Sequence, residues 1–155
     1  MTEAAPRMPM PLVLIESPFA APEPELLRLN VDYARAAMHD CLVNHGEAPY
    51  ASHLLYTQPG VLDDNVPEQR MLGINAGLDW GAMAAKTVVY TDLGMSRGMR
   101  FGIDRAEREG RPIEYRSLPG WTALKAAIEA SIAMRPAYET STNRVVCAFE
   151  AWKRP

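Results

Sequence analysis

Groups that could hold an anion follow a strand pattern near the middle of the chain. Residues 87–91 are apolar and rich in β-branched side chains, as in a buried strand, and the run breaks at Asp92. Ser96 then serves as a helix N-cap, and a helical pattern continues to Glu109. Free N–H groups at a helix start favour an anion, typically a phosphate. We therefore expect an anion site at this strand–turn–helix, on the carboxyl edge of a sheet.

The loops expected around this turn carry groups suited to a sugar and a phosphate. Serine hydroxyls and backbone N–H groups can hold oxyanions, and an arginine adds positive charge. Aromatic rings can stack on a base, and carboxylates can bond to hydroxyls or to a base edge. The ligand-binding candidates are Ser17, Phe19, His53, Tyr56, Asp63, Asp92, Gly94, Ser96, Arg97 and Gly98. For Asp92, formation of the turn is an alternative role, and Asp64 is a further possible partner for hydroxyls.

Several kinds of chemistry lack the residues that they need. The sequence has neither a Gly-x-Gly-x-x-Gly run nor a Gly-x-x-x-x-Gly-Lys-Ser/Thr loop, and its three histidines form no zinc pattern. We therefore expect no metal and no cofactor. The net charge of −3 argues against a nucleic-acid polymer as partner.

The N-terminal region predicts no membrane attachment. The apolar run at residues 12–15 is too short to cross a membrane, and residues 1–11 lack the apolar core of a signal peptide. We therefore expect a cytoplasmic protein. Cys41 falls on an apolar helical face and is expected to be a small buried side chain.

Strand and helix patterns alternate along the chain. Strands are predicted at residues 12–15, 47–53, 87–91 and 112–116, and helices at 25–44, 67–82, 97–109 and 121–134. This alternation predicts an α/β fold, a small doubly wound parallel sheet of the flavodoxin or Rossmann-like type, with helices on both faces. We expect four to five strands in the order 2-1-3-4 and a site at the switch point between strands 1 and 3.

The chain of 155 residues is long enough for one domain. We expect a flexible arm at 1–11, a single nucleotide-binding domain at 12–135 and a C-terminal extension at 136–155 packed on it. In that extension, residues 145–149 could add a strand and Trp152 could anchor the tail. Glycines recur every four residues at Gly73, Gly77 and Gly81. They predict close packing of their helix, with approach of a ligand to the backbone as the alternative.

Five segments in this order resemble the nucleoside 2-deoxyribosyltransferase-like superfamily, over about residues 12–117. They are Ser17-Pro18-Phe19, Asn30 in a helix, Gly46-Glu47-Ala48-Pro49 with Ser52-His53, Gly94-Met95-Ser96-Arg97-Gly98, and Gly110-Arg111-Pro112. The chain is most similar to uncharacterised phage-type and bacterial members. The resemblance implies cleavage of the bond between base and sugar, in a nucleoside or nucleotide. It also implies sites at subunit interfaces, so a homodimer or higher homo-oligomer is plausible.

One position departs from the family pattern. The resemblance implies a nucleophilic glutamate four residues after the glycine of the Ser-x-Gly turn, where this chain has Gly102. One explanation is that another carboxylate acts in its place, with Asp92 the first candidate and Glu16 the second. The other is that the protein binds a nucleotide-derived ligand without cleaving it. A structural or assembly role is a third possibility.

Overall fold

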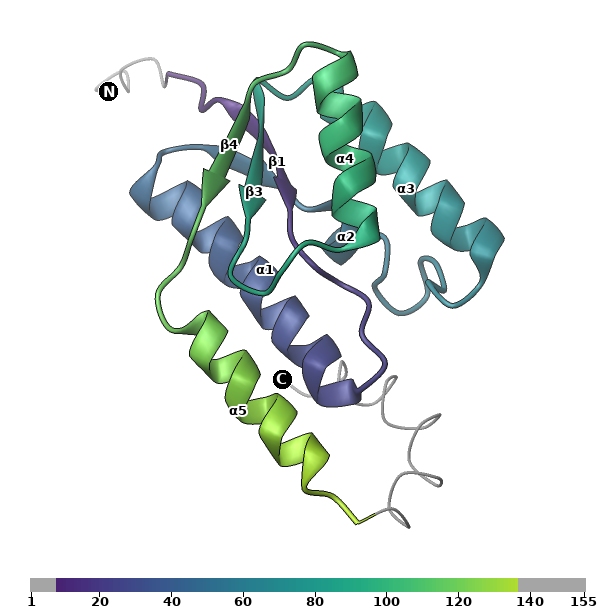
Figure 1. Cartoon of the computed structure of the whole chain (residues 1–155). Helices are drawn as coiled ribbons and strands as arrows, with labels where there is room; N and C mark the ends of the chain where they lie inside the picture. The colour runs from purple at the N-terminus through teal and green to yellow at the C-terminus, as the bar shows by residue number, and fades with distance from the viewer. Residues whose placement is uncertain (1–7, 137–155) are drawn as a thin grey trace, which may run out of the picture.

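The computed structural model describes residues 8–136, which form one α/β unit (Figure 1). Its elements are β1 (Leu12–Glu16), α1 (Pro24–Asn44), β2 (Ala48–Tyr50), α2 (Ser52–Leu55), α3 (Pro67–Gly81), β3 (Lys86–Tyr90), α4 (Arg97–Arg108), β4 (Ile113–Arg116) and α5 (Trp121–Ala133). Most of the expected arm at 1–11 and of the extension at 136–155 lies outside the described residues, including the strand expected at 145–149 and the anchor expected at Trp152.

The four strands form one parallel sheet in the order β2-β1-β3-β4. This confirms the predicted fold class and the predicted strand order. The chain enters at β1, moves outward to β2, and returns through β3 on the other side of β1. The carboxyl ends of β1 and β3 are therefore neighbours, and the direction of winding reverses between them.

Side chains of β1 alternate between the two faces of the sheet, and each face has its own helices. Val13 and Ile15 belong to the core cluster that includes side chains of α1, and Trp121 and Ile128 of α5 pack against the same cluster. Glu16 points the other way, toward α4. In Figure 1, α1 and α5 lie on one side of the sheet, and α3 and α4 lie together on the other.

The glycines of α3 serve close packing. A Cβ atom at Gly77 would lie 2.6 Å from the Ser52 side chain of α2, and one at Gly81 would lie 2.9 Å from Leu14 of β1. This confirms the packing interpretation of the glycine repeat. Not every apolar side chain of the helices is buried: Met71 of α3 is 52% exposed and Leu124 of α5 is 46% exposed.

The second predicted strand was too long. Pairing with β1 ends at Tyr50, and Ser52 begins the short helix α2, whose first turn is closed by the N–H groups of Leu54 and Leu55 donating to the Ala51 carbonyl. The early turn lets Ser52 pack against the glycine face of α3. It also carries the chain over the carboxyl end of β1, toward the site described below.

A buried group of charges ties both edges of the sheet together. Arg116 of β4 donates to both carboxylate oxygens of Glu47, at 2.9 and 3.0 Å, and both side chains are less than a tenth exposed. Lys86 of β3 pairs with the same carboxylate at 2.6 Å. These ion pairs hold the segment before β2 and the edge strand β4 in register on the α1 side of the sheet.

Candidate functional site

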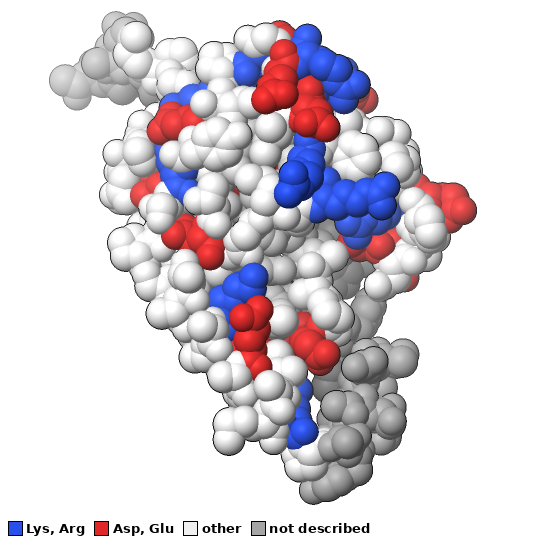
Figure 2. All heavy atoms as spheres, viewed as in Figure 1, with Lys and Arg blue, Asp and Glu red and all other residues white. Residues whose placement is uncertain are grey.

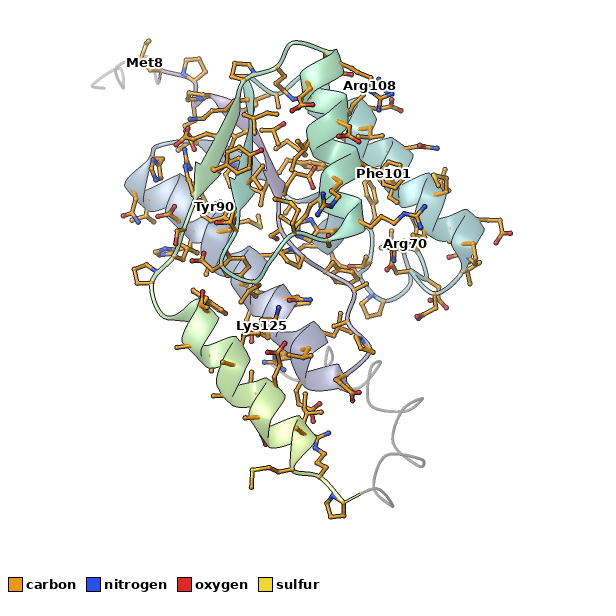
Figure 3. All side chains as sticks on the ribbon, viewed as in Figure 1. Met8, Arg70, Tyr90, Phe101, Arg108 and Lys125 are labelled. Atoms are coloured by element: carbon orange, nitrogen blue, oxygen red, sulfur yellow. The ribbon has the colours of Figure 1, made fainter. Side chains whose placement is uncertain are left out.

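A cavity of about 310 Å³ opens at the carboxyl end of β1, between α2, α3 and the start of α4. Its walls are made by the end of β1, by α2 and the loop that follows it, and by the facing sides of α3 and α4. Figure 3 shows Arg70 of α3 and Phe101 of α4 on the same side of the molecule, and both line the cavity. The predicted candidates that line it are Glu16, Ser17, Phe19, His53, Tyr56, Ser96, Arg97 and Gly98.

Glu16 and Gly102 meet inside this cavity. A Cβ atom at Gly102 would lie 1.8 Å from Oε1 of Glu16 and 2.4 Å from its carboxyl carbon, far inside contact distance. The carboxyl group of Glu16 therefore occupies space that any side chain at position 102 would need. Glycine at this point of α4 is what allows an acid at the end of β1 to fold in over the helix.

Glu16 has no hydrogen-bond or ion-pair partner among residues 8–136. Burial raises the pKa of this carboxyl to about 8, and the positive charge of Arg111 partly opposes that rise. Glu16 retains some surface toward the cavity. At neutral pH it is thus mainly a neutral carboxylic acid, able to donate a hydrogen bond or a proton to whatever fills the cavity.

Arg111 lies outside the cavity lining, and its charge acts on Glu16. Its side chain is 5% exposed, and it donates from Nε to Thr87 at 3.0 Å and from Nη1 to the carbonyl of Gly81 at 2.8 Å. Its Nη2 is buried without a hydrogen-bond partner in the described part of the chain. The guanidinium therefore sits fixed in the layer between the sheet and α3, on the same face as Glu16.

Ser17 and His53 form a hydrogen-bonded pair on the adjacent wall. The distance from Ser17 Oγ to His53 Nε2 is 2.9 Å, and Ser17 is 4% exposed. Burial lowers the pKa of His53 to about 4, so the ring is neutral at pH 7 and can donate at one nitrogen and accept at the other. Phe19 lies edge-on to the ring at 6.3 Å, and Asn30 of α1 fixes the Phe19 carbonyl with a 2.8 Å hydrogen bond.

The first turn of α4 forms the mouth of the cavity. Ser96 caps the helix by accepting from the N–H of Met99 at 3.2 Å. The N–H groups of Arg97 and Gly98 lie at the start of the helix and therefore have no acceptor within it. Arg97 lines the mouth with its guanidinium 5.9 Å from the centre of the Phe101 ring. The basic side chains on this side of the molecule are visible in Figure 2.

Asp92 lies outside the cavity lining. Its carboxylate accepts hydrogen bonds from Tyr33 at 2.5 Å, from Ser117 at 2.5 Å and from the N–H of Leu118 at 2.8 Å. Burial works against ionisation, but these donors outweigh it and hold the pKa of Asp92 below its usual value. The carboxylate thus joins the β3–α4 loop to α1 and to the β4–α5 loop, which is a structural role made through residues distant in sequence and differs from the local turn-forming alternative.

Two other candidates also lie away from the cavity. Gly94 is exposed and adopts a φ of +95°, and Lys125 lies 4.0 Å from where its Cβ would be. Asp63 is exposed, and its carboxylate accepts from the backbone and side chain of Asn65, at 2.9 and 3.0 Å. Its neighbour Asp64 lines the cavity, as do Tyr56, Thr57 and Leu62 of the same loop.

The contribution of α3 was not predicted. Arg70 and Gln69 line the cavity, and Arg70 pairs with Asp64 at 2.6 Å. The sequence contained a signal that could have predicted this contribution: these residues lie in the first turns of a helix that follows a long loop, and long loops are often functional. The small side of α3 at Gly73 and Gly77 also borders the cavity, which lets the helix approach without filling it.

The described residues also show what metal-binding and membrane-spanning features they lack. No group of three or more histidine, cysteine, aspartate or glutamate side chains within residues 8–136 is arranged to hold a metal ion. No helix in that range has the length and apolar character needed to span a membrane.

Comparison with known proteins gives a family but no activity. Neither the curated proteins nor the solved structures contain a match to this chain. Residues 11–116, which run from the start of β1 to the end of β4, match a family described as a domain of unknown function (DUF7768). The match thus covers the sheet and every wall of the cavity, and the chain belongs to the DUF7768 family.

Proposed function

We propose that this protein acts at the N-glycosidic bond of a (deoxy)nucleoside or its 5′-monophosphate, with Glu16 as the acid. The observation that carries the proposal is the unpartnered carboxyl of Glu16, folded over Gly102 inside the cavity. The resemblance described above implies an acid at position 102, and the Glu16 carboxyl fills the space beside that position. An acid from the strand thus serves where the family pattern has one on the helix.

The protonation state of Glu16 suits one step of this reaction. A neutral carboxylic acid can give its proton to the departing base, which lowers the barrier to cleavage. Water adds its oxygen to the anomeric carbon, and the C–N bond breaks with its electron pair going to the base. The base takes the Glu16 proton, and the proton lost by water restores the acid. A second base in place of water would give transfer instead of hydrolysis.

The aromatic walls fit the base. Phe19 and Tyr56 line the cavity near the Ser17–His53 pair. Their rings offer stacking surfaces, and the neutral imidazole and the serine hydroxyl offer both donor and acceptor atoms to a base edge. Because Asn30 holds the Phe19 backbone from α1, this wall is placed before a ligand arrives.

The carboxylates of the cavity also support a second function, binding without cleavage. Besides Glu16, the carboxylate that lines the cavity is Asp64, and it is already paired with Arg70 at 2.6 Å. Since Glu16 keeps its proton at pH 7, the described cavity offers no ionised carboxylate that is free to activate water or to attack the sugar. This arrangement supports the alternative of a module that binds a nucleotide-derived ligand without cleaving it.

The test is release of free base, followed by chromatography, from a panel of nucleosides and 5′-monophosphates. We expect release by the wild type, its loss in Glu16→Gln, and no change in Glu107→Gln, which removes an exposed carboxylate of α4 outside the cavity lining. Asp92→Asn tests the other acid candidate. We expect this variant to lose activity only to the extent that it loses folded protein.

The outcomes separate the two functions. Release at the wild-type rate in Glu16→Gln would overturn the role of Glu16. No release from any member of the panel, together with a rise in Tm with one nucleotide, would favour the binding module. If neither release nor a rise in Tm occurs, both functions are wrong. The exchange variant with Glu16→Gly and Gly102→Glu returns the acid to α4, and activity there would show that the acid's place in the cavity matters more than its element.

A further inference from the structure

Two polar groups in the layer between the sheet and the helices α3 and α4 have no hydrogen-bond partner within the described part of the chain. The first is the carboxyl of Glu16, which lies against Gly102 of α4. The second is Nη2 of Arg111, which is fully buried. Folded proteins rarely leave a buried nitrogen of this kind unpaired, so its lack of a partner needs an explanation.

The register of the sheet places these two groups near each other. Leu14 and Glu16 are two residues apart in β1, so their side chains project from the same face, about 7 Å apart along the strand. Leu14 pairs with Thr87 of β3, and Nε of Arg111 donates to the Thr87 hydroxyl at 3.0 Å. Nη2 of Arg111 is 3.7 Å from the place of a Cβ at Gly81, which is itself 2.9 Å from Leu14. The guanidinium therefore lies beside Leu14, one step along the strand from Glu16.

The other nitrogens of Arg111 hold the guanidinium in place. Besides the bond from Nε to Thr87, Nη1 donates to the Gly81 carbonyl at 2.8 Å and to a Glu109 oxygen at 2.5 Å. These contacts fix the plane of the group and leave the N–H groups of Nη2 unused. Charge-assisted hydrogen bonds from a guanidinium to a carboxylate are among the strong ones. Nη2 is therefore a fixed donor suited to a carboxylate oxygen.

Ionisation of Glu16 would create the acceptor that Nη2 lacks. No ion pair joins Glu16 to Arg111 while the carboxyl lies over Gly102. Rotation about the side-chain bonds of Glu16 into another staggered rotamer can carry its carboxyl along the strand toward Leu14. Among the described residues, Arg111 is the one whose charge acts on the pKa of Glu16. The other charged or titratable side chains that line the cavity are His53, Asp64, Arg70 and Arg97.

We propose that Arg111 is a positioning residue for Glu16, and that its Nη2 receives the carboxylate once the acid has given its proton away. Glu16 then has one position over Gly102, where it is neutral, and a second against Arg111, where it is ionised. This deepens the proposed function and rests on it for the reaction in which the proton is given away.

The pair has a defined part in that reaction. When the O–H bond of Glu16 breaks, the proton goes to a nitrogen of the departing base and the electron pair stays on the carboxylate. The hydrogen bond from Arg111 stabilises this charge, which burial alone would make costly. A proton from the attacking water then returns to Glu16 and releases it from Arg111. Arg111 thus makes a buried acid strong enough to donate its proton.

The test follows Glu16 and Arg111 in one pH titration of the full chain. Carbon-detected NMR of protein labelled with ¹³C-glutamate and ¹³C,¹⁵N-arginine records the Glu16 carboxyl and the Arg111 guanidinium between pH 6 and 9.5. Glu16→Gln and Arg111→Lys assign the two signals by their absence. We expect the Arg111 signal to shift with the same midpoint as the Glu16 carboxyl and to stay constant in Glu16→Gln. His53, with a pKa of about 4, does not titrate in this range.

Variants at Arg111 measure what its charge does to the acid. Arg111→Met should move the midpoint of the Glu16 titration up by at least about one pH unit, and Arg111→Lys, which keeps the charge, by less. In the base-release assay, kcat should fall about tenfold in Arg111→Met with KM unchanged, because the acid is weaker. Arg105→Met is the matched control, because Arg105 also pairs with Glu109 but does not line the cavity.

An Arg111 signal that stays constant while Glu16 titrates would overturn the pair. So would a Glu16 midpoint that Arg111→Met leaves unchanged or that Arg105→Met moves equally. If Arg111→Met does not fold, the wild-type titration still decides, because it keeps the arginine. Neither titration uses a substrate. Joint titration without base release would support the pair and overturn the reaction, whereas base release with an unresponsive Arg111 would overturn the pair alone.

Discussion

Replacing Glu16 by glutamine should stabilise the protein at neutral pH. The unfolded chain has an ordinary glutamate with a pKa near 4.5, whereas burial raises the pKa of Glu16 to about 8 in the folded protein. Between these values the folded protein keeps a proton that the unfolded chain has released. Stability from this proton is complete below pH 4.5 and is lost as the pH rises toward 8.

The size of the effect follows from the pKa difference. At pH 7 Glu16 is still mostly protonated in the folded protein, whereas it is ionised in the unfolded chain. Raising the pH from 4.5 to 7 therefore lowers the free energy of unfolding by up to about 3 kcal/mol. Glutamine has the shape of the neutral acid and does not titrate. Glu16→Gln should therefore gain up to about 3 kcal/mol at pH 7 and almost nothing at pH 4.

Urea unfolding at pH 4, 5.5, 7 and 8, followed by tryptophan fluorescence, measures this gain. Glu107→Gln, an exposed glutamate, controls for the loss of one charge and should show no such trend. The reasoning is refuted if the stability difference between Glu16→Gln and wild type is the same at pH 4 and pH 7. It is also refuted if the variant becomes less stable than wild type as the pH rises. A residue that lowers stability while facing a cavity is the usual sign of a retained function.

Three further expectations concern the same contacts. Gly102→Ala should lower stability by about 1–3 kcal/mol, because its Cβ meets the Glu16 carboxyl, and urea unfolding should show the loss cancelled when Glu16→Gly is added. Arg116→Met should lower stability by about 3–5 kcal/mol by leaving Glu47 buried without its bidentate partner, measured in the same way at pH 7, with recovery of part of the loss if Glu47→Gln is added. Base release should fall as the pH rises above about 8, where Glu16 loses its proton, and a pH profile of kcat/KM that stays flat to pH 9 would exclude Glu16 as the acid.

The sequence specified the fold well because its signals are local and repeated. The β-branched run of β3 and the αL glycine at Gly46, which ends α1 with a φ of +62°, placed boundaries to within a residue or two. The alternation of strands and helices then required parallel pairing and predicted a site at the carboxyl edge of the sheet. The turn at Ser52 was missed because its cause is tertiary: it packs against Gly77, which is distant in sequence.

The site was only partly predictable for the same reason. The sequence placed Glu16 and the start of α4 at one edge of the sheet, and the structure brings both into the cavity. It could not show that Gly102 makes room for Glu16, because the two residues are 86 positions apart in the sequence. Nor could it show where Asp92 points, since Tyr33 of α1 decides that direction.

The contact between Glu16 and Gly102 restricts which amino acids can occur together at the two positions among relatives. With the acid present at 16, even alanine at 102 brings a Cβ atom within 1.8 Å of a carboxylate oxygen. A side chain at position 102 therefore requires either that the flexible Glu16 carboxyl turns aside or that position 16 becomes smaller. Among relatives, acids should therefore rarely occupy both positions, and an alignment of the family would test this expectation.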